Sequence, residues 1–229
     1  MQRPTVAREV SAPAAANRGI AGPVPSIRRL RQADLRELTP IACQAFRQNA
    51  FYRDTLGFDA EQFNRYWKAF LALALSDSAC RVYGATTDNG LAGAIVLGLH
   101  GFPRPATGLR FLCALLTRLG PRRLARYLRF VRAYDRAMDR PEAELRVEGR
   151  GLWFFVGVEA QARGLGRRLV RYAEQSLRRD GVRLTTGFID GGNTRLLHFY
   201  QRLGYSVSEP FAFLGSQAAR IEKWTGEPC

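Results

Sequence analysis

The stretch that decides the fold is Val156-Gly157-Val158-Glu159-Ala160-Gln161-Ala162-Arg163-Gly164-Leu165-Gly166-Arg167-Arg168. Its first residues end a near-continuous apolar run, Leu152 to Val158, which is typical of a strand buried on both faces in the middle of a sheet. Apolar residues then recur at helical spacing on one side, namely Leu169, Val170, Ala173 and Leu177. Unpaired N–H groups and the positive dipole end at a helix start attract anions, and glycines allow a close approach. The stretch therefore predicts a strand, a turn and a helix that together hold a phosphate group.

Two commoner phosphate motifs are absent from the sequence. No glycine-rich loop ends in Lys-Ser/Thr, and no G-x-G-x-x-G opens the first strand–helix unit. A second distinctive stretch lies downstream, Asn193-Thr194-Arg195-Leu196-Leu197-His198-Phe199-Tyr200-Gln201-Arg202-Leu203-Gly204-Tyr205. Asn is a favoured residue at a helix start and Gly at a helix end, so this stretch predicts a short helix closed by Gly204.

The two stretches together resemble the GNAT family of N-acetyltransferases. Gln161, Gly164 and Gly166 match the family's motif A, Q/R-x-x-G-x-G/A. Asn193, Tyr200 and the pair Gly204-Tyr205 match its downstream pattern, N-x(6)-Y/F-x-x-x-G-F/Y. The resemblance covers roughly residues 26–214.

The resemblance implies an α/β fold of the mixed α+β type. It implies a mostly antiparallel sheet of six or seven strands with flanking helices, and a helical insertion between the third and fourth strands. The fourth and fifth strands would splay apart, opened by a bulge on the fourth, for which Gly157 is the expected position.

The resemblance also implies acetyl-CoA as the co-substrate and assigns roles at the site. Pantetheine would pair with the backbone of Val156 and Val158, with Asn193 holding the same arm. The pyrophosphate would rest on N–H groups from Ala162 to Arg167, with the charges of Arg163, Arg167 and Arg168 close by. The expected coenzyme-binding set is Val156, Gly157, Val158, Gln161, Ala162, Arg163, Gly164, Leu165, Gly166, Arg167, Arg168, Asn193 and Tyr200.

Three chemical roles remain to be filled by the protein. Tyr200 matches the family tyrosine near the sulfur, and its phenol could protonate the departing thiolate; the alternative is an aromatic residue packed in the core. Asn193 serves equally well as an N-cap. A backbone N–H, at Val156, is the expected oxyanion donor. Glu148, near the start of the fourth strand, is the candidate general base, against the alternative of a solvated surface carboxylate.

The rest of the chain predicts one domain, residues 26–229, after a flexible tail rich in Ala, Pro and Gly, residues 1–25. Asp34 with Glu37, and Asp59 with Gln62, predict helix starts of the capping-box type. Asn89-Gly90 predicts a tight turn between two strands. The expected strands are residues 27–31, 81–87, 91–100, 152–158, 183–189 and 205–214.

Residues 103–147 interrupt the strand pattern as an arginine-rich helical insertion. From Pro121 to Met138, apolar residues form one stripe and arginines the opposite face. Three interpretations stay open: a lid that shapes the acceptor pocket, a contact with a membrane surface or nucleic acid, or a solvated basic face. A basic helix beside the pocket would disfavour polycationic acceptors.

Composition sets the remaining expectations. The formal net charge of +15 comes almost wholly from arginine. A surface with this charge attracts polyanions such as coenzyme A. The four cysteines show neither metal-ligand spacing nor the density of a disulfide scaffold, so a cytoplasmic protein without metal is expected. No apolar run is long enough to span a bilayer.

The function expected is acetyl or short-acyl transfer to a primary amine of a small molecule or peptide, by a monomer or homodimer. The alternatives are a non-catalytic coenzyme A sensor or scaffold of the same fold, and a basic adaptor for nucleic acid or membranes.

Overall fold

A computed structural model describes residues 25–47, 49–139, 141, 144, 146–161 and 164–224. Within these residues, eight strands form one sheet in the order β1-β2-β3-β4-β5-β8-β6, with β7 paired to β8. The strands are β1 (Ser26–Arg29), β2 (Cys80–Thr87), β3 (Gly90–Leu99), β4 (Glu148–Val156), β5 (Leu184–Asp190), β6 (Ser206–Val207), β7 (Phe211–Phe213) and β8 (Ser216–Trp224). Every pairing is antiparallel except that of β4 with β5.

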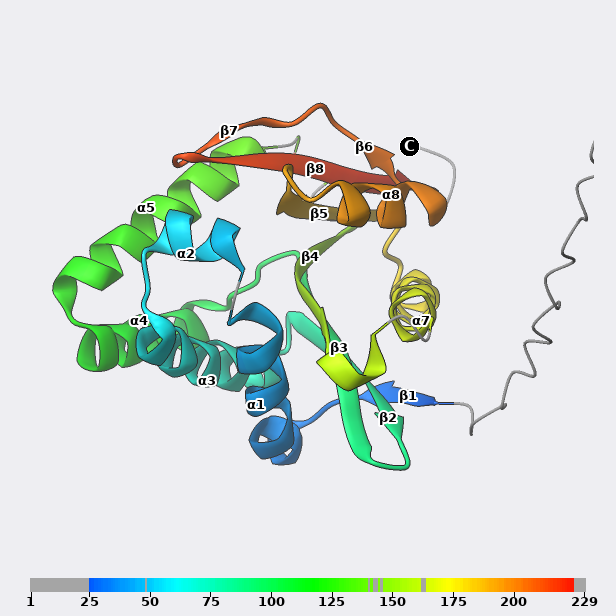
Figure 1. Cartoon of the computed structure of the whole chain (residues 1–229), viewed down its shortest axis with the longest axis horizontal. Coiled ribbons are helices and arrows are strands. Elements are labelled where there is room, and N and C mark those ends of the chain that lie inside the picture. Colours follow the sequence, from blue (N-terminus) through cyan, green and yellow to red (C-terminus); the bar gives the residue numbers. More distant parts are fainter. Residues whose placement is uncertain are drawn as a thin grey trace, which may run out of the picture.

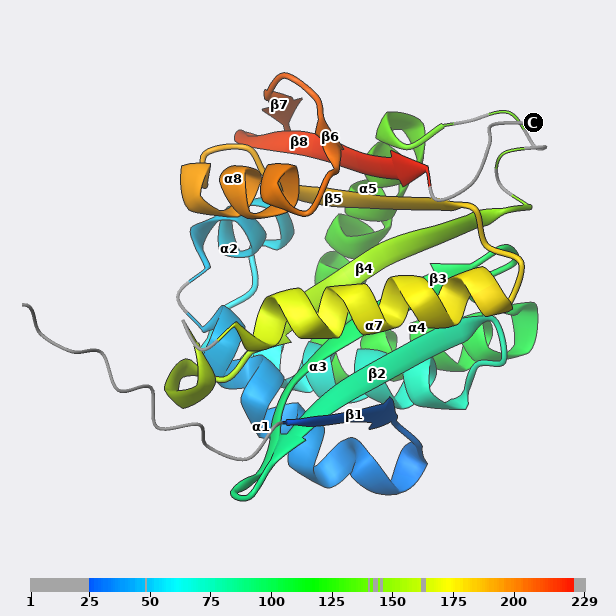
Figure 2. The same cartoon turned by 90° about the vertical axis from the view of Figure 1, so that its right-hand side faces the viewer.

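Helices cover both faces of this strongly twisted sheet (Figures 1 and 2). They are α1 (Leu35–Phe46), α2 (Ala50–Leu56), α3 (Ala60–Ser76), α4 (Pro105–Leu119), α5 (Pro121–Ala137), α7 (Leu165–Arg179) and α8 (Thr194–Arg202), with 3₁₀ turns η1 (Gln32–Asp34) and η2 (Val158–Ala160). One core cluster joins α1 and α3 to a face of the β2–β4 region, and a second joins α7 and α8 to the opposite face. The third cluster places α2 and α5 against β5, β7 and β8.

The predicted fold class is confirmed, and the sheet is larger than expected. Strand β8 was missed, although it lies between β5 and β6 and pairs along the whole of β5. Its sequence mixes charged residues with small ones, and Ile221 is the one large apolar side chain that it buries deeply. Such a strand gives little hydrophobic alternation, so the periodicity of the sequence does not reveal it. The predicted tail, residues 1–25, lies outside the described residues except for Pro25.

One of the two predicted capping boxes is present. At the start of α3, Asp59 accepts the Gln62 N–H at 2.9 Å, and the Gln62 side chain accepts the Asp59 N–H at 3.3 Å. At α1 the prediction was wrong in its chemistry. Asp34 instead accepts the Arg31 N–H at 2.7 Å and pairs with Arg28 at 2.6 Å, and Glu37 accepts the N–H of Leu91 on β3. The helix still begins where the pattern indicated.

Strands β4 and β5 separate, as the family resemblance implied. They pair only between residues 148–151 and 184–187, with Gly151 opposite Gly187 as the last pair. Beyond it β4 follows β3 and β5 follows β8, and Figure 2 shows the two strands diverging. The bulge on β4 is at Leu152. Trp153 pairs with Val96 and Gly151 with Leu97, so Leu152 has no partner residue on β3. The prediction of a bulge at Gly157 was wrong, since the Gly157 N–H continues the ladder by donating to Ala92 O at 2.8 Å.

The insertion forms two helices, α4 and α5, that pack on each other and on the rest of the domain. Within α5, Tyr127 contacts Tyr66 and Phe111, and Tyr134 contacts Phe188. Two of its arginines bind the end of α2: Arg123 donates to Gly57 O at 2.9 Å and Arg126 to Asp54 O at 3.0 Å. These carbonyls belong to the last turn of α2, whose carbonyls lack helical partners. Part of the arginine bias is therefore structural.

Candidate active site

The predicted phosphate loop connects the end of β4 to the start of α7. Gly164 is the N-cap of α7 and has a φ of +73°, a conformation that favours glycine. A Cβ built on Gly164 would meet no atom within 4 Å, so this side of the loop is open. The first N–H groups of α7 have no partner inside the helix and point toward this open end. The geometry is that of an anion site at a helix N-terminus.

Gly166 is required for a different reason. A Cβ at this position would lie 2.9 Å from Cζ of Phe154 on β4, whose ring stacks on that of Phe199 on α8 with centroids 5.8 Å apart. Glycine thus lets α7 approach β4 closely. Leu165 is buried in the core, so only its backbone can face a ligand.

The charged residues of this loop are only partly free. Arg167 and Arg168 are exposed in the first turn of α7, and Arg168 donates to Pro25 O at 3.2 Å. The expected roles of Ala162 and Arg163 fall outside the described residues. Gln161 is exposed, and its amide donates to Val156 O at 3.1 Å.

The end of β4 turns the backbone N–H and carbonyl of Val156 toward the gap, where the carbonyl already accepts the Gln161 amide. Gly157 bonds toward β3, and backbone groups of successive strand residues point in alternating directions, so the N–H and carbonyl of Val156 face away from β3. This is the side from which β5 has separated. Val158 does not continue the strand but begins η2. A ligand arm can therefore pair with β4 at Val156, as an added strand would.

A cavity of about 90 Å³ lies in the gap between the separated strands, and we call it the gap cavity. Residues of β4 and β5 line it together with Val170 of α7 and Tyr200 of α8. Tyr200 is buried, with its ring 5.2 Å from that of Tyr205. Burial, and next the nearby charge of Glu174, raise the pKa of the Tyr200 phenol above its ordinary value. The phenol therefore stays protonated well above neutral pH.

Asn193 caps α8, with its side chain accepting the Leu196 N–H at 3.0 Å. The structural alternative for this residue is thus confirmed. Its amide N–H₂ is not used by that bond and the residue is exposed, which leaves a donor for a ligand.

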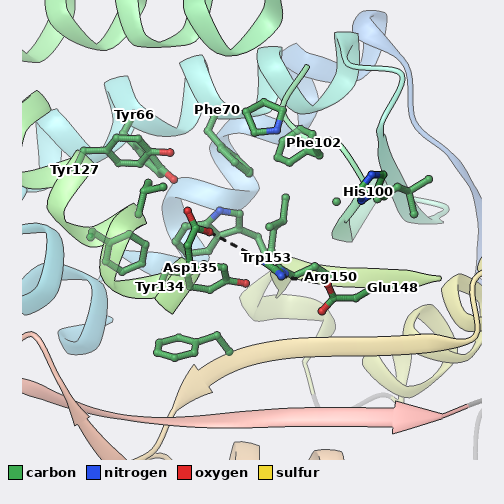
Figure 3. A pocket seen from close by; sticks show the side chains of 18 of the residues that line it. Tyr66, Phe70, His100, Phe102, Tyr127, Tyr134, Asp135, Glu148, Arg150 and Trp153 are labelled. Atoms are coloured by element: carbon green, nitrogen blue, oxygen red, sulfur yellow. Dashed lines mark hydrogen bonds and ion pairs between the residues drawn. The ribbon is translucent and has the colours of Figure 1, made fainter. Parts of the chain in front are cut away.

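A larger cavity, of about 310 Å³, lies beneath the insertion, and we call it the aromatic cavity (Figure 3). Aromatic side chains from α2, α3, α5 and β4 line it, among them Tyr66, Phe70, Tyr127, Tyr134 and Trp153. The residues common to this wall and the gap cavity are Tyr52, Leu152, Trp153 and Phe188. The two cavities therefore share a wall where β4 bulges and separates from β5.

A charged cluster forms one side of the aromatic cavity, as Figure 3 shows. Arg150 donates to Glu148 at 3.1 Å and lies 3.7 Å from the carboxylate of Asp135 on α5. Glu148 also accepts a hydrogen bond from the Thr186 hydroxyl on β5. The interpretation of Glu148 as a solvated surface carboxylate was wrong, because the residue is 5% exposed. Partial burial raises the pKa of the Asp135 carboxyl, although its side chain is still 62% exposed, and the charge of Arg150 opposes this shift.

Sequence reasoning missed the aromatic cavity and two of its charged residues, Asp135 and Arg150. The apolar stripe of residues 121–138 was the available signal for this cavity, because its tyrosines form part of the cavity wall. His100 is exposed and also lines the cavity, whereas the exposed His198 and Glu159 line neither cavity. Across the described ranges, no group of three or more His, Cys, Asp or Glu residues is arranged to hold a metal ion. In the same residues, no helix has the length and apolarity needed to cross a membrane.

The sequence matches the acetyltransferase (GNAT) family over residues 44–205, more than half of its length, and the chain belongs to this family. GNAT enzymes use acetyl-CoA as their co-substrate. A comparison with curated proteins finds no match.

Solved structures show the same fold at low sequence identity. The PaiA N-acetyltransferase from Thermoplasma acidophilum, in complex with coenzyme A, is 17% identical with a TM-score of 0.55, over 88% of this chain and 99% of the other. A putative acetyltransferase from Salmonella typhimurium, solved with acetyl-CoA, is 16% identical with a TM-score of 0.54, over 90% and 97%. The ribosomal-protein-alanine N-acetyltransferase from Brucella melitensis is 17% identical with a TM-score of 0.54, over 87% and 99%.

Proposed function

We propose that the protein transfers an acetyl or short acyl group from acyl-CoA to a primary amine by direct attack of the amine on the thioester. The observation that carries this proposal is the wall that two cavities share at the gap between β4 and β5. One is lined in part by Val170 of α7, and the other lies beneath the insertion. Two substrates entering from the two sides would place their reacting atoms at a common point.

The residues of the first side fit coenzyme A. The amides at the start of α7, with Gly164 leaving the approach open, would hold the pyrophosphate. The backbone of Val156 and Val158 and the free amide of Asn193 would hold the pantetheine arm. When bound, the coenzyme supplies an activated carbonyl in the gap.

The protein's own groups then serve the transfer. The nitrogen of the amine forms a bond to the carbonyl carbon, and the carbon–sulfur bond breaks. The N–H of Val156 faces the gap and would stabilise the charge that develops on the carbonyl oxygen. Tyr200 would give its phenolic proton to the departing sulfur. Glu148 would accept the proton that the incoming ammonium must lose, by way of water in the aromatic cavity.

Thiol release in the presence of a panel of primary amines tests this function. Release that needs both acetyl-CoA and an amine is the expected result. Tight coenzyme binding without release for any amine would instead favour a coenzyme sensor. The adaptor alternative predicts association with nucleic acid or anionic vesicles that weakens steeply with salt and survives loss of Gly164 and Gly166.

A further inference from the structure

The basic insertion places little of its arginine charge in the wall of the aromatic cavity. Helix α5 turns Tyr127, Val131 and Tyr134 toward the cavity. Its exposed arginines are Arg122, Arg129, Arg132 and Arg136. The insertion thus gives the cavity hydrocarbon and aromatic surface rather than arginine charge.

This surface favours a ligand whose main part is an aromatic or branched hydrocarbon group. Tyr66 and Tyr127 face each other with ring centroids 5.9 Å apart, and Trp153 lies 6.0 Å from Phe70. A cavity of about 310 Å³ falls at the lower end of the usual range for small-molecule sites. Flat or branched hydrocarbon groups gain most from leaving water for such a space.

The charged cluster restricts what else the ligand can carry. Among the described residues of the wall, Glu148 and Asp135 are the carboxylates and Arg150 is the guanidinium. Arg150 donates to Glu148 and lies 3.7 Å from the carboxylate of Asp135, so a carboxylate on the ligand would have to compete with both for its charge. The cluster carries a net charge of −1, which matches one ammonium group. Each further ammonium would lose its hydration without a free carboxylate to replace it.

One polar atom of the wall lacks a partner. The hydroxyl of Tyr134 is buried and finds no hydrogen-bond partner in the described part of the chain. The Tyr134 ring lies 5.2 Å from that of Phe188, which also borders the gap cavity. A buried hydroxyl of this kind gains from a ligand that supplies a hydrogen bond, and an amine placed near the gap can do so.

We infer that the acceptor is a small primary amine with a single positive charge, an aromatic or branched hydrocarbon body and no carboxylate. This inference rests on the proposed function, since it identifies the aromatic cavity as the acceptor site. Tyr66, Tyr127 and Trp153 hold the body, and the Glu148–Arg150–Asp135 cluster receives the ammonium. The charged cluster disfavours amino acids and polyamines.

Initial rates with saturating acetyl-CoA test the acceptor class, with 2-phenylethylamine as the probe. Phenylalanine is the matched comparator because it differs only by a carboxylate. Spermidine tests the effect of additional ammonium groups, and ethanolamine tests the loss of the aromatic group. The expected kcat/KM for 2-phenylethylamine is at least about 10-fold above each comparator. An equal or higher value for any of the three would overturn the inference.

Two further measurements separate this inference from the proposed function. Coenzyme A binding is measured by calorimetry on the same protein. Binding of 2-phenylethylamine is measured by intrinsic tryptophan fluorescence, with and without coenzyme A, and the response should be lost in Trp153→Phe. Coenzyme binding without a saturable response to the amine overturns the acceptor class alone. Saturable amine binding without coenzyme binding overturns the proposed function instead.

A substitution tests whether the acceptor binds in the aromatic cavity. Val131→Trp fills the wall of the aromatic cavity and should raise KM for 2-phenylethylamine about 10-fold or more, with coenzyme affinity changed less than about 2-fold. Ala125→Trp, at an exposed position of the same helix, is the control and should leave both values unchanged. An unchanged KM in a folded Val131→Trp protein, checked by its melting temperature, would exclude the aromatic cavity as the acceptor site.

Discussion

Arg150 holds the carboxylate of Glu148 at 3.1 Å, and the same carboxylate accepts a hydrogen bond from Thr186 across the last paired segment of β4 and β5. This buried pair lies just before the strands separate, at the wall of the cavity assigned to the acceptor. Its position gives Glu148 a structural role, to which the proposed function adds the role of a proton acceptor.

A pH profile distinguishes these two roles. Glu148→Gln should lower kcat/KM about 10- to 100-fold at pH 7. The deficit should shrink toward pH 9, because more of the amine is then neutral without help from a base. Asp77→Asn is the control, since Asp77 is a buried carboxylate that accepts the N–H of Arg104 and lines neither cavity. A deficit in Glu148→Gln that is the same at both pH values would leave only the structural role.

Two glycines at opposite ends of α7 provide a matched test of the phosphate site. Gly164 has a φ of +73° and Gly181 a φ of +81°, and a Cβ at either would meet nothing within 4 Å. Alanine at each position should therefore cost a similar 1–2 kcal/mol or so of stability. Only Gly164→Ala puts its methyl group at the coenzyme end, and it should raise the Kd for coenzyme A about 10-fold. Equal Kd values for the two variants in calorimetry would remove the site from this end of the helix.

Tyr200 is tested by removing its hydroxyl. Tyr200→Phe should lower kcat at least about 100-fold, with KM for acetyl-CoA little changed. Because burial raises the pKa of the phenol, the protonated acid persists as pH rises, so wild-type kcat should show no fall from this group up to about pH 10. Tyr83→Phe, at an equally buried tyrosine outside both cavities, is the control. Full activity in Tyr200→Phe would return this residue to a packing role.

The two arginines that bind the end of α2 should control the acceptor side alone. Replacing Arg123 and Arg126 together with alanine frees α5 from α2 and should raise KM for the amine about 5-fold or more, without changing the Kd for coenzyme A. Replacing the exposed Arg122 and Arg129 of the same helix removes the same charge and should change neither value. Parallel losses in both double variants would point to charge rather than to the anchoring of the helix.

The sequence was informative where function depends on local chain chemistry. Gly164 and Gly166 predicted the turn from β4 into α7, and Asn89-Gly90 predicted the turn between β2 and β3. Features that depend on contacts between distant segments were not predictable. The bulge at Leu152 depends on register with β3, and Glu148 is buried only because Thr186 and Arg150 satisfy its oxygens. The aromatic cavity combines side chains from residues as far apart as 52 and 188, and no window of the sequence contains this set.

A crystal structure with acetyl-CoA bound tests the central claim most directly. It should show the pyrophosphate on the first amides of α7, next to Gly164. The thioester should lie between residues 152–156 of β4 and residues 188–190 of β5, with its carbonyl facing the aromatic cavity. Coenzyme bound elsewhere, or a thioester closed off from the aromatic cavity, would contradict the account.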